Sequence, residues 1–228
     1  MKFLFIDEVT IPQKERNFLG VGAILIDTKN YIKFKESFQK AFSELKWTSK
    51  IEFKGRYIFS KKGDSSVPVE KRITFIYKIA KSSKAKKNAR YTFYFAYNFK
   101  GKIKDNYILL LKSIGRNLPK PSSRKGDKRL IALYMDKRND VKENELFLEI
   151  NEIFKQRDYF LFEKPFLVDS TNLTPGIIIV DVLSYLMSWK VLSSDDFLLF
   201  HYQIPNTYKR KLEEVRRILD LIKNVRQI

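Results

Sequence analysis

Short apolar runs rich in β-forming residues alternate along this chain with longer segments of helical periodicity. Residues 2–6 read KFLFI and residues 130–135 read LIALYM, and each run is followed directly by a carboxylate, Asp7 or Asp136. Between these runs, the apolar positions of residues 30–45 recur at intervals of three and four, which is typical of an amphipathic helix. Strands and helices that alternate in this way favour an α/β fold, with a mixed sheet flanked by helices.

The remaining elements are predicted from the same two periodicities. The run FLGVGAILI at residues 18–26 predicts a second strand, which we expect to be the hairpin partner of the first. Further strands are expected at 91–99 and within 159–168, and further helices at 69–80, 106–118, 143–155, from Pro175 onward, and at about 207–226. No internal repeat and no long linker divides the sequence, so we expect a single domain over residues 1–228.

Composition excludes several classes of protein. Of the 228 residues, 44% are hydrophobic and 14% aromatic, which is enough apolar side chain to form a core and excludes a disordered chain. The absence of cysteine excludes disulfides, thiolate metal sites and cysteine nucleophiles, and fits a reducing compartment. No apolar run approaches the roughly 18 residues that a membrane span needs. We therefore expect a cytoplasmic protein without a membrane segment.

The chain is strongly basic, with 45 Lys and Arg against 26 Asp and Glu and a formal net charge of +19. Such an excess favours a polyanionic partner such as DNA or RNA, although a lysine-rich proteome would produce it too. Basic stretches at 81–90, 120–129 and 209–217 either form solvated faces or neutralise phosphates beside an acidic cleft. The predicted nucleic-acid contacts are Lys54, Lys86, Lys87, Arg124, Lys125, Lys137 and Arg138.

Four acidic residues stand where folding does not require a carboxylate. Asp7 and Asp136 follow predicted strands, Glu52 follows a helix, and Asp181 interrupts the apolar segment GIIIVDVLSYL. An unpaired carboxylate in such a segment costs on the order of several kcal/mol in desolvation, so Asp181 should face a cation, a polar cleft or water. Mg²⁺ and Mn²⁺ prefer oxygen ligands, and a pair of them can activate the attacking water and stabilise the leaving oxygen in phosphodiester hydrolysis.

Each of these carboxylates also has a plainer interpretation. Asp7 and Glu8 could be solvated charges at an ordinary strand exit, and Asp136 could be the first residue of a turn. Glu52 could point outward from a short strand. Asp181 could form a buried pair with an arginine or lysine. The residues alone leave these alternatives open.

Four motifs nevertheless occur in the order found in one family. They are LFIDEV at 4–9, IEFKG at 51–55, LYMDKRND at 133–140 and DSTNLTPGIIIVDVLSYL at 169–186. Together they resemble an uncharacterised branch of the ribonuclease H-like superfamily, the family catalogued as domain of unknown function 3800. Its members have a strand running into Asp-Glu-Ser, a Glu-x-Lys-Gly element, a strand followed by Asp, and an Asp-Ser segment ending in Gly-Ile-Gln-x-Ala-Asp.

The resemblance implies a ribonuclease H-like mixed β-sheet flanked by α-helices, in which acidic residues from separate segments converge. Asp7, Glu52, Asp136 and Asp181 would then be catalytic ligands of Mg²⁺ or Mn²⁺, with Glu8 as a further ligand. The implied activity is hydrolysis of phosphodiester bonds in DNA or RNA by a metal-dependent nuclease.

Two departures from the family pattern keep other functions open. Val9 replaces the Ser of the first motif, and in the last motif Ile178 and Val180 replace Gln and Ala. The alternative is a catalytically weak or inactive nucleic-acid-binding or scaffold subunit of a larger complex, such as a phage-defence or mobile-element system. A third is hydrolysis of a nucleotide or another small phosphate ester. The final helix could serve a homodimer.

Overall fold

The protein is built around one mixed sheet, which a computed structural model describes over residues 1–12, 17–48, 52–58, 64–82, 91–99, 103–120, 130–136, 143–168, 174–192, 206–220 and 225–228. The strands are β1 (Lys2–Ile11), β2 (Phe18–Asp27), β3 (Thr92–Asn98), β4 (Leu130–Asp136), β5 (Phe160–Leu161), β6 (Phe166–Val168) and β7 (Val225–Gln227). Their order is β5-β4-β1-β2-β3-β7, and β6 also pairs with β4. β1, β2 and β3 are antiparallel neighbours, whereas β4 is parallel to β1.

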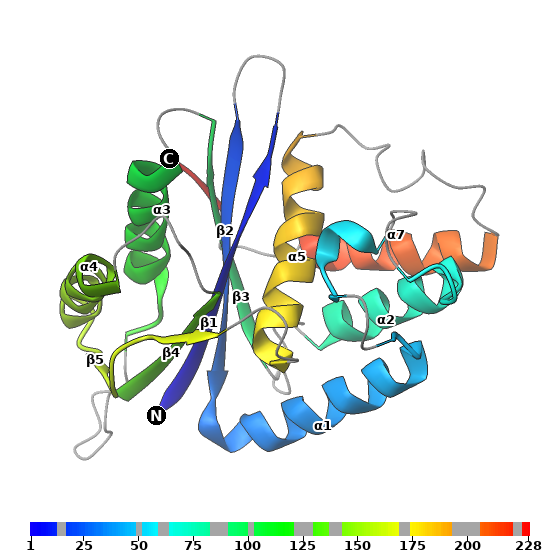
Figure 1. The fold of residues 1–228 in the computed structure, drawn as a ribbon, viewed down its shortest axis with the longest axis horizontal. Helices are drawn as coiled ribbons and strands as arrows, with labels where there is room; N and C mark the ends of the chain where they lie inside the picture. Colours follow the sequence, from blue (N-terminus) through cyan, green and yellow to red (C-terminus); the bar gives the residue numbers. More distant parts are fainter. Residues whose placement is uncertain are drawn as a thin grey trace.

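Helices cover both faces of this sheet. They are α1 (Thr28–Leu45), α2 (Val69–Lys81), α3 (Ile103–Asn117), α4 (Glu143–Lys155), α5 (Pro175–Leu192) and α7 (Asn206–Asp220), with a short 3₁₀ turn η1 (Gly55–Tyr57). Figure 1 shows α3 and α4 on one side of the sheet, and α1, α2, α5 and α7 on the other. The predicted α/β fold with a mixed, helix-flanked sheet is thus confirmed.

The two faces of the sheet carry separate apolar clusters. In β1, Leu4 and Ile6 point toward α3 and α4, whereas Phe5 and Ile11 pack with residues of α1, α2, α5 and α7. β2 is buried from Phe18 to Ile26 because both of its faces are covered. Its sequence is therefore continuously apolar, instead of alternating as a half-exposed strand would.

Strand β1 is longer than the sequence predicts. The apolar run ends at Ile6, yet the strand continues through Asp7 and Glu8 to Ile11. Pairing with β2 sustains it, because the antiparallel register extends from Lys2 opposite Asp27 to Ile11 opposite Phe18. The expectation that Asp7 stands at a strand end is therefore wrong for β1, although Asp136 does end β4.

The C-terminal segment also differs from the prediction. The helix expected at about 207–226 is α7, which ends at Asp220. Residues Val225–Gln227 instead form β7 and pair in parallel with Phe95–Tyr97 of β3. β3 would otherwise have been the edge of the sheet, with unpaired backbone groups, and three residues suffice to pair with part of that edge.

Helix α5 is the most apolar element of the fold. Within the described part of the chain, it is the one helix whose length and composition would suit a membrane span. In this structure 67% of it is buried. It packs on β1 and β2, and a core helix meets the same criteria of length and composition.

Candidate functional site

Carboxylates from four distant segments line one pocket of about 200 Å³. Asp7 and Glu8 come from β1, Asp136 ends β4, and Asp181 lies on α5. Glu52 reaches the pocket from the extended residues that precede η1. All five acidic residues singled out in the sequence therefore meet in one place.

The register of the sheet brings Asp7 and Asp136 together. β1 and β4 pair in parallel up to Ile6 opposite Met135, so the next residues along both strands stand level with each other. Strand alternation places both carboxylates on the face that α5 covers, as it does Phe5. Glu8 follows on the alternate side of β1.

Two glycines, which have no side chain, let α5 approach that face of the sheet closely. The residue opposite Asp7 on β2 is Gly22, and a Cβ atom there would lie 1.9 Å from Oγ of Ser184. At the start of α5, a Cβ atom on Gly176 would lie 2.3 Å from the ring of Phe5. The helix therefore packs close to the backbone of β2 at Gly22 and against the ring of Phe5 on β1, and this contact carries the Asp181 carboxylate to the side of Asp7.

A third glycine brings η1 against α5. The backbone N–H of Gly55 donates a hydrogen bond of 2.5 Å to Oδ2 of Asp181. A Cβ atom at Gly55 would lie 2.9 Å from Cβ of Tyr185 and 3.0 Å from the Asp181 carbonyl oxygen. This contact fixes the orientation of Asp181 and holds Glu52 and Lys54 at the pocket.

Arg72 of α2 joins the end of η1 to residues 64–67, and sequence reasoning did not identify it. Its buried guanidinium donates hydrogen bonds to the carbonyl oxygens of Tyr57 at 3.2 Å, Ile58 at 3.2 Å and Val67 at 2.9 Å, and also to that of Asp64. Position 72 falls on the apolar face of the predicted helix. An arginine on such a face is a sign that the side chain is buried and binds other polar groups, and this sign was present in the sequence.

Burial and the neighbouring charges shift the pKa values of two pocket carboxyls, Asp7 and Asp181. Burial is the main cause that raises the pKa of Asp7 well above its ordinary value, followed by the negative charges of Asp181, Glu8 and Asp136. Burial likewise raises the pKa of Asp181 to about 6, although the Gly55 N–H and the Lys54 ammonium oppose the shift. In the folded protein, ionisation of Asp7 and Asp181 is therefore less favourable than it is for an exposed aspartate.

Lys54 is the cation that most directly offsets this charge. Its Nζ lies 3.1 Å from Oε1 of Glu52. Burial lowers the pKa of Lys54, but the hydrogen bond to Glu52 and the charges of Glu52, Asp136 and Asp181 outweigh it, so the pKa is raised overall. Arg56 also lines the pocket, and it was not among the predicted contacts.

The donor set fits a hard divalent cation in its chemistry. Carboxylate oxygens are the ligands that Mg²⁺ and Mn²⁺ prefer, and a cation would favour the charged forms of Asp7 and Asp181, whose pKa values are raised by burial and by neighbouring negative charges. Across the described ranges, however, no group of three or more acidic, histidine or cysteine side chains is arranged to hold a metal ion. The pocket gathers suitable ligands without presenting a finished coordination shell.

One of the predicted nucleic-acid contacts lies at this pocket. Lys54 lines it. The other predicted contacts, Lys86, Lys87, Arg124, Lys125, Lys137 and Arg138, lie outside the described residues.

Comparison with known proteins gives no family for the chain. No protein-family model matches the sequence, and a search of curated proteins finds no similar one. The resemblance to the ribonuclease H-like family therefore remains a prediction based on the four sequence motifs.

Proposed function

We propose that this protein is a divalent-metal-dependent nuclease that hydrolyses phosphodiester bonds in DNA or RNA, in a ribonuclease H-like domain. One observation supports the proposal above all others. Five carboxylates from four separate segments line a single pocket, in a chain whose formal net charge is +19. A basic protein that concentrates acidic groups at one point is suited to hold cations there and a polyanion around them.

In this proposal Asp7, Asp136 and Asp181 are the principal ligands of Mg²⁺ or Mn²⁺, and Glu52 and Glu8 complete the set. Bound ions would supply an activated water and stabilise the charge on the leaving oxygen of the phosphodiester. The paired backbones of β1 and β4 hold Asp7 and Asp136 in position.

The neighbouring groups have supporting roles in the proposed reaction. The Gly55 N–H holds one oxygen of Asp181, so that the carboxylate keeps its orientation when a ligand binds. Lys54 and Arg56 both line the pocket, and their cationic groups suit the non-bridging oxygens of the scissile phosphate. Lys54 pairs with Glu52 in the absence of substrate.

Cleavage of labelled DNA and RNA, single-stranded and duplex, by the purified full chain tests this proposal. We expect cleavage with Mn²⁺ that EDTA abolishes, and a loss of roughly 100-fold or more in Asp7→Asn and Asp181→Asn. Asp220→Asn is the matched control, because Asp220 pairs with Lys190 outside the pocket, and it should cleave like the parent protein.

Metal binding is measured separately from cleavage. Mn²⁺ should raise the melting temperature of the parent protein and of Asp220→Asn, since a ligand bound only by the native state stabilises it, and should have much less effect on Asp181→Asn. Cleavage that persists unchanged in both pocket variants would refute the assignment of these ligands.

A non-catalytic nucleic-acid-binding subunit is the second candidate. It is favoured by the Lys54–Glu52 ion pair, which already offsets part of the negative charge, and by the lack of an assembled metal-binding group within the described residues. This candidate predicts salt-sensitive association with DNA or RNA and no turnover in Mn²⁺. Its affinity for nucleic acid should change little in Asp7→Asn.

A further inference from the structure

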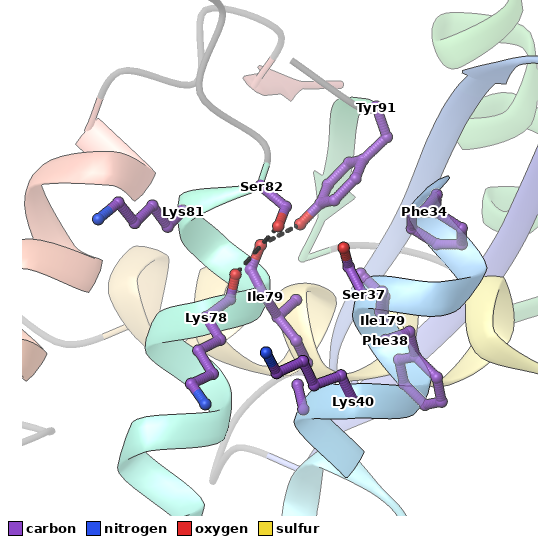
Figure 2. A pocket seen from close by; sticks show the side chains of 11 residues that line it. Phe34, Ser37, Phe38, Lys40, Lys78, Ile79, Lys81, Ser82, Tyr91 and Ile179 are labelled. Carbon is purple, nitrogen blue, oxygen red and sulfur yellow. Dashed lines mark hydrogen bonds between the residues drawn. The ribbon is translucent and has the colours of Figure 1, made fainter. Parts of the chain in front are cut away.

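A larger pocket, of about 450 Å³, lies between α1 and α2. Figure 2 shows Phe34, Ser37 and Phe38 on one side of it, Lys78, Ile79 and Ser82 on the other, and Tyr91 above. Helix α5 contributes Ile179, two residues before the Asp181 of the acidic site. The volume falls within the roughly 300–1,000 Å³ that is usual for small-molecule sites, whereas the acidic pocket is smaller.

The wall of this pocket is part of the apolar core. Its apolar and aromatic lining residues are each at most 6% exposed and belong to the cluster on the α5 side of the sheet; they are Phe34, Phe38, Ala41, Ile79, Tyr91 and Ile179. A ligand whose apolar body packs against this wall would remove its own apolar surface from water, which is the main source of affinity at sites of this kind.

Hydrogen bonds hold one side of the wall in place. The hydroxyl of Tyr91 donates to the carbonyl oxygen of Ile79 at 2.7 Å, and the hydroxyl of Ser82 donates to that of Lys78 at 3.1 Å. Both bonds are drawn in Figure 2. The first ties the residue before β3 to the end of α2, so the aromatic ring keeps a fixed position beside the pocket.

The charged residues of the lining are all lysines. Lys40, Lys78 and Lys81 line the pocket, and none of the described residues that line it is acidic. Figure 2 shows the ammonium group of Lys40 directed toward α2, whereas Nζ of Lys81 points away from the pocket and lies 5.5 Å from the centroid of the Tyr77 ring. Lys78 pairs with Glu44, which lies outside the pocket. A ligand with one negative charge would therefore find favourable charges at the pocket and no carboxylate to repel it.

We propose that this pocket binds an amphipathic anion, with a compact alkyl or aromatic body and one carboxylate, phosphate or sulfonate group. The body packs on Phe34, Phe38 and Ile79, and the anionic group lies beside the ammonium group of Lys40. The proposal is independent of the nuclease proposal, because none of these residues belongs to the acidic pocket.

Titration of the full chain with 1-anilinonaphthalene-8-sulfonate tests the proposal, because this probe has an aromatic body and one anionic group and fluoresces when shielded from water. We expect saturable binding at one site, competition by decanoate and octyl phosphate, and no competition by decylamine. The two competitors distinguish a carboxylate from a phosphate preference. Unsaturable binding, or equal competition by decylamine, would overturn the proposal.

Variants locate the site. Ala41→Phe fills the pocket, and the double variant Lys40→Glu with Lys81→Glu reverses its charge; each should weaken binding by about tenfold or more. Lys35→Glu is the matched control, since Lys35 is an exposed residue of α1 that does not line the pocket, and it should bind the probe like the parent protein.

The lysine variants keep the test decisive if Ala41→Phe fails to fold, because Lys40 and Lys81 are exposed. Circular dichroism confirms that the variants compared are folded. Unchanged affinity in the double lysine variant would place the probe elsewhere and overturn the proposal.

Discussion

The local environment of Asp181 conflicts with a charge on its carboxyl group. Burial and the charges of Asp136 and Glu52 raise its pKa to about 6, against 3.8 for an ordinary aspartate. An acid whose pKa is raised by folding stabilises the native state only while it stays protonated. Its favourable contribution is therefore complete below about pH 4 and is lost as the pH rises through about 6.

Asp181→Asn should consequently stabilise the metal-free protein at neutral pH. In EDTA at about pH 7.5 we expect the free energy of unfolding to rise by about 1–3 kcal/mol, because the amide is uncharged and its oxygen still accepts the Gly55 N–H. At about pH 4 the two proteins should differ little. Urea unfolding at both pH values measures this, and equal stability at neutral pH would show that the carboxylate is not in conflict with its surroundings.

At the scale of elements, the contact of α5 with the sheet determines the geometry of the acidic pocket. The helix rests on β1 and β2 where Gly22 and Gly176 carry no side chain. Oγ of Ser184 faces Gly22 and is buried without a hydrogen-bond partner among the described residues. The contact is thus one of shape, and a single added methyl group should disturb it.

Gly22→Ala should lower the free energy of unfolding by about 1–3 kcal/mol, because the new methyl group overlaps Oγ of Ser184. Ser184→Ala alone should be nearly neutral, since its hydroxyl makes no hydrogen bond within the described structure. The double variant should recover part of the loss, which urea unfolding measures as a coupling energy.

Ser188→Ala provides the matched control for that cycle. Ser188 is a buried serine of the same helix whose hydroxyl donates to the Ser184 carbonyl oxygen at 2.7 Å, and it does not face Gly22. Its coupling to Gly22→Ala should be close to zero. If both serine variants showed the same coupling energy with Gly22→Ala, the cause would be a shift of the whole helix and not a local overlap with Oγ of Ser184.

The elements themselves were largely predictable from local pattern. The helix beginning at Pro175 was found because proline suits the first turn, and β2 because its apolar run is bounded by polar residues. The continuation of β1 through Asp7 was not predictable, since two charged residues ordinarily end an apolar strand and the pairing that sustains this one is supplied by β2.

The acidic pocket was predictable in its members but not in its construction. Asp181 stood out because an apolar helix seldom contains a carboxylate. Nothing local to Gly22, Gly55 or Gly176 shows which atoms of another element will approach them, because these contacts join residues far apart in the chain. β7 was missed because a strand of three residues has no recognisable periodicity.

At the scale of the whole molecule, a concentration of acidic groups is set within a strongly basic chain. The formal net charge of +19 includes the carboxylates of the pocket, so the remaining residues carry a still larger positive excess. Long-range attraction of a polyanion and local repulsion at the pocket are therefore separate effects, which respond differently to salt and to metal.

Salt should accordingly control the affinity of this protein for nucleic acid. We expect the affinity for a short DNA or RNA oligonucleotide, measured in EDTA by fluorescence anisotropy, to fall by roughly 100-fold or more between about 50 and about 200 mM salt. Asp181→Asn should leave the slope of the logarithmic salt dependence unchanged. An affinity that does not change with salt concentration would contradict the proposal that nucleic acid is the partner of this protein.

The long hairpin of β1 and β2 gives the two sides of the acidic pocket unequal stiffness. Asp7 lies within a strand whose backbone is hydrogen-bonded along its full length to β2, whereas Glu52 belongs to a short extended piece beside a single 3₁₀ turn. Local opening is rare in the first setting and frequent in the second. If the pocket acts as proposed, adjustment to substrates of different shape should therefore come from the Glu52 side, while β1 holds Asp7 in a fixed position.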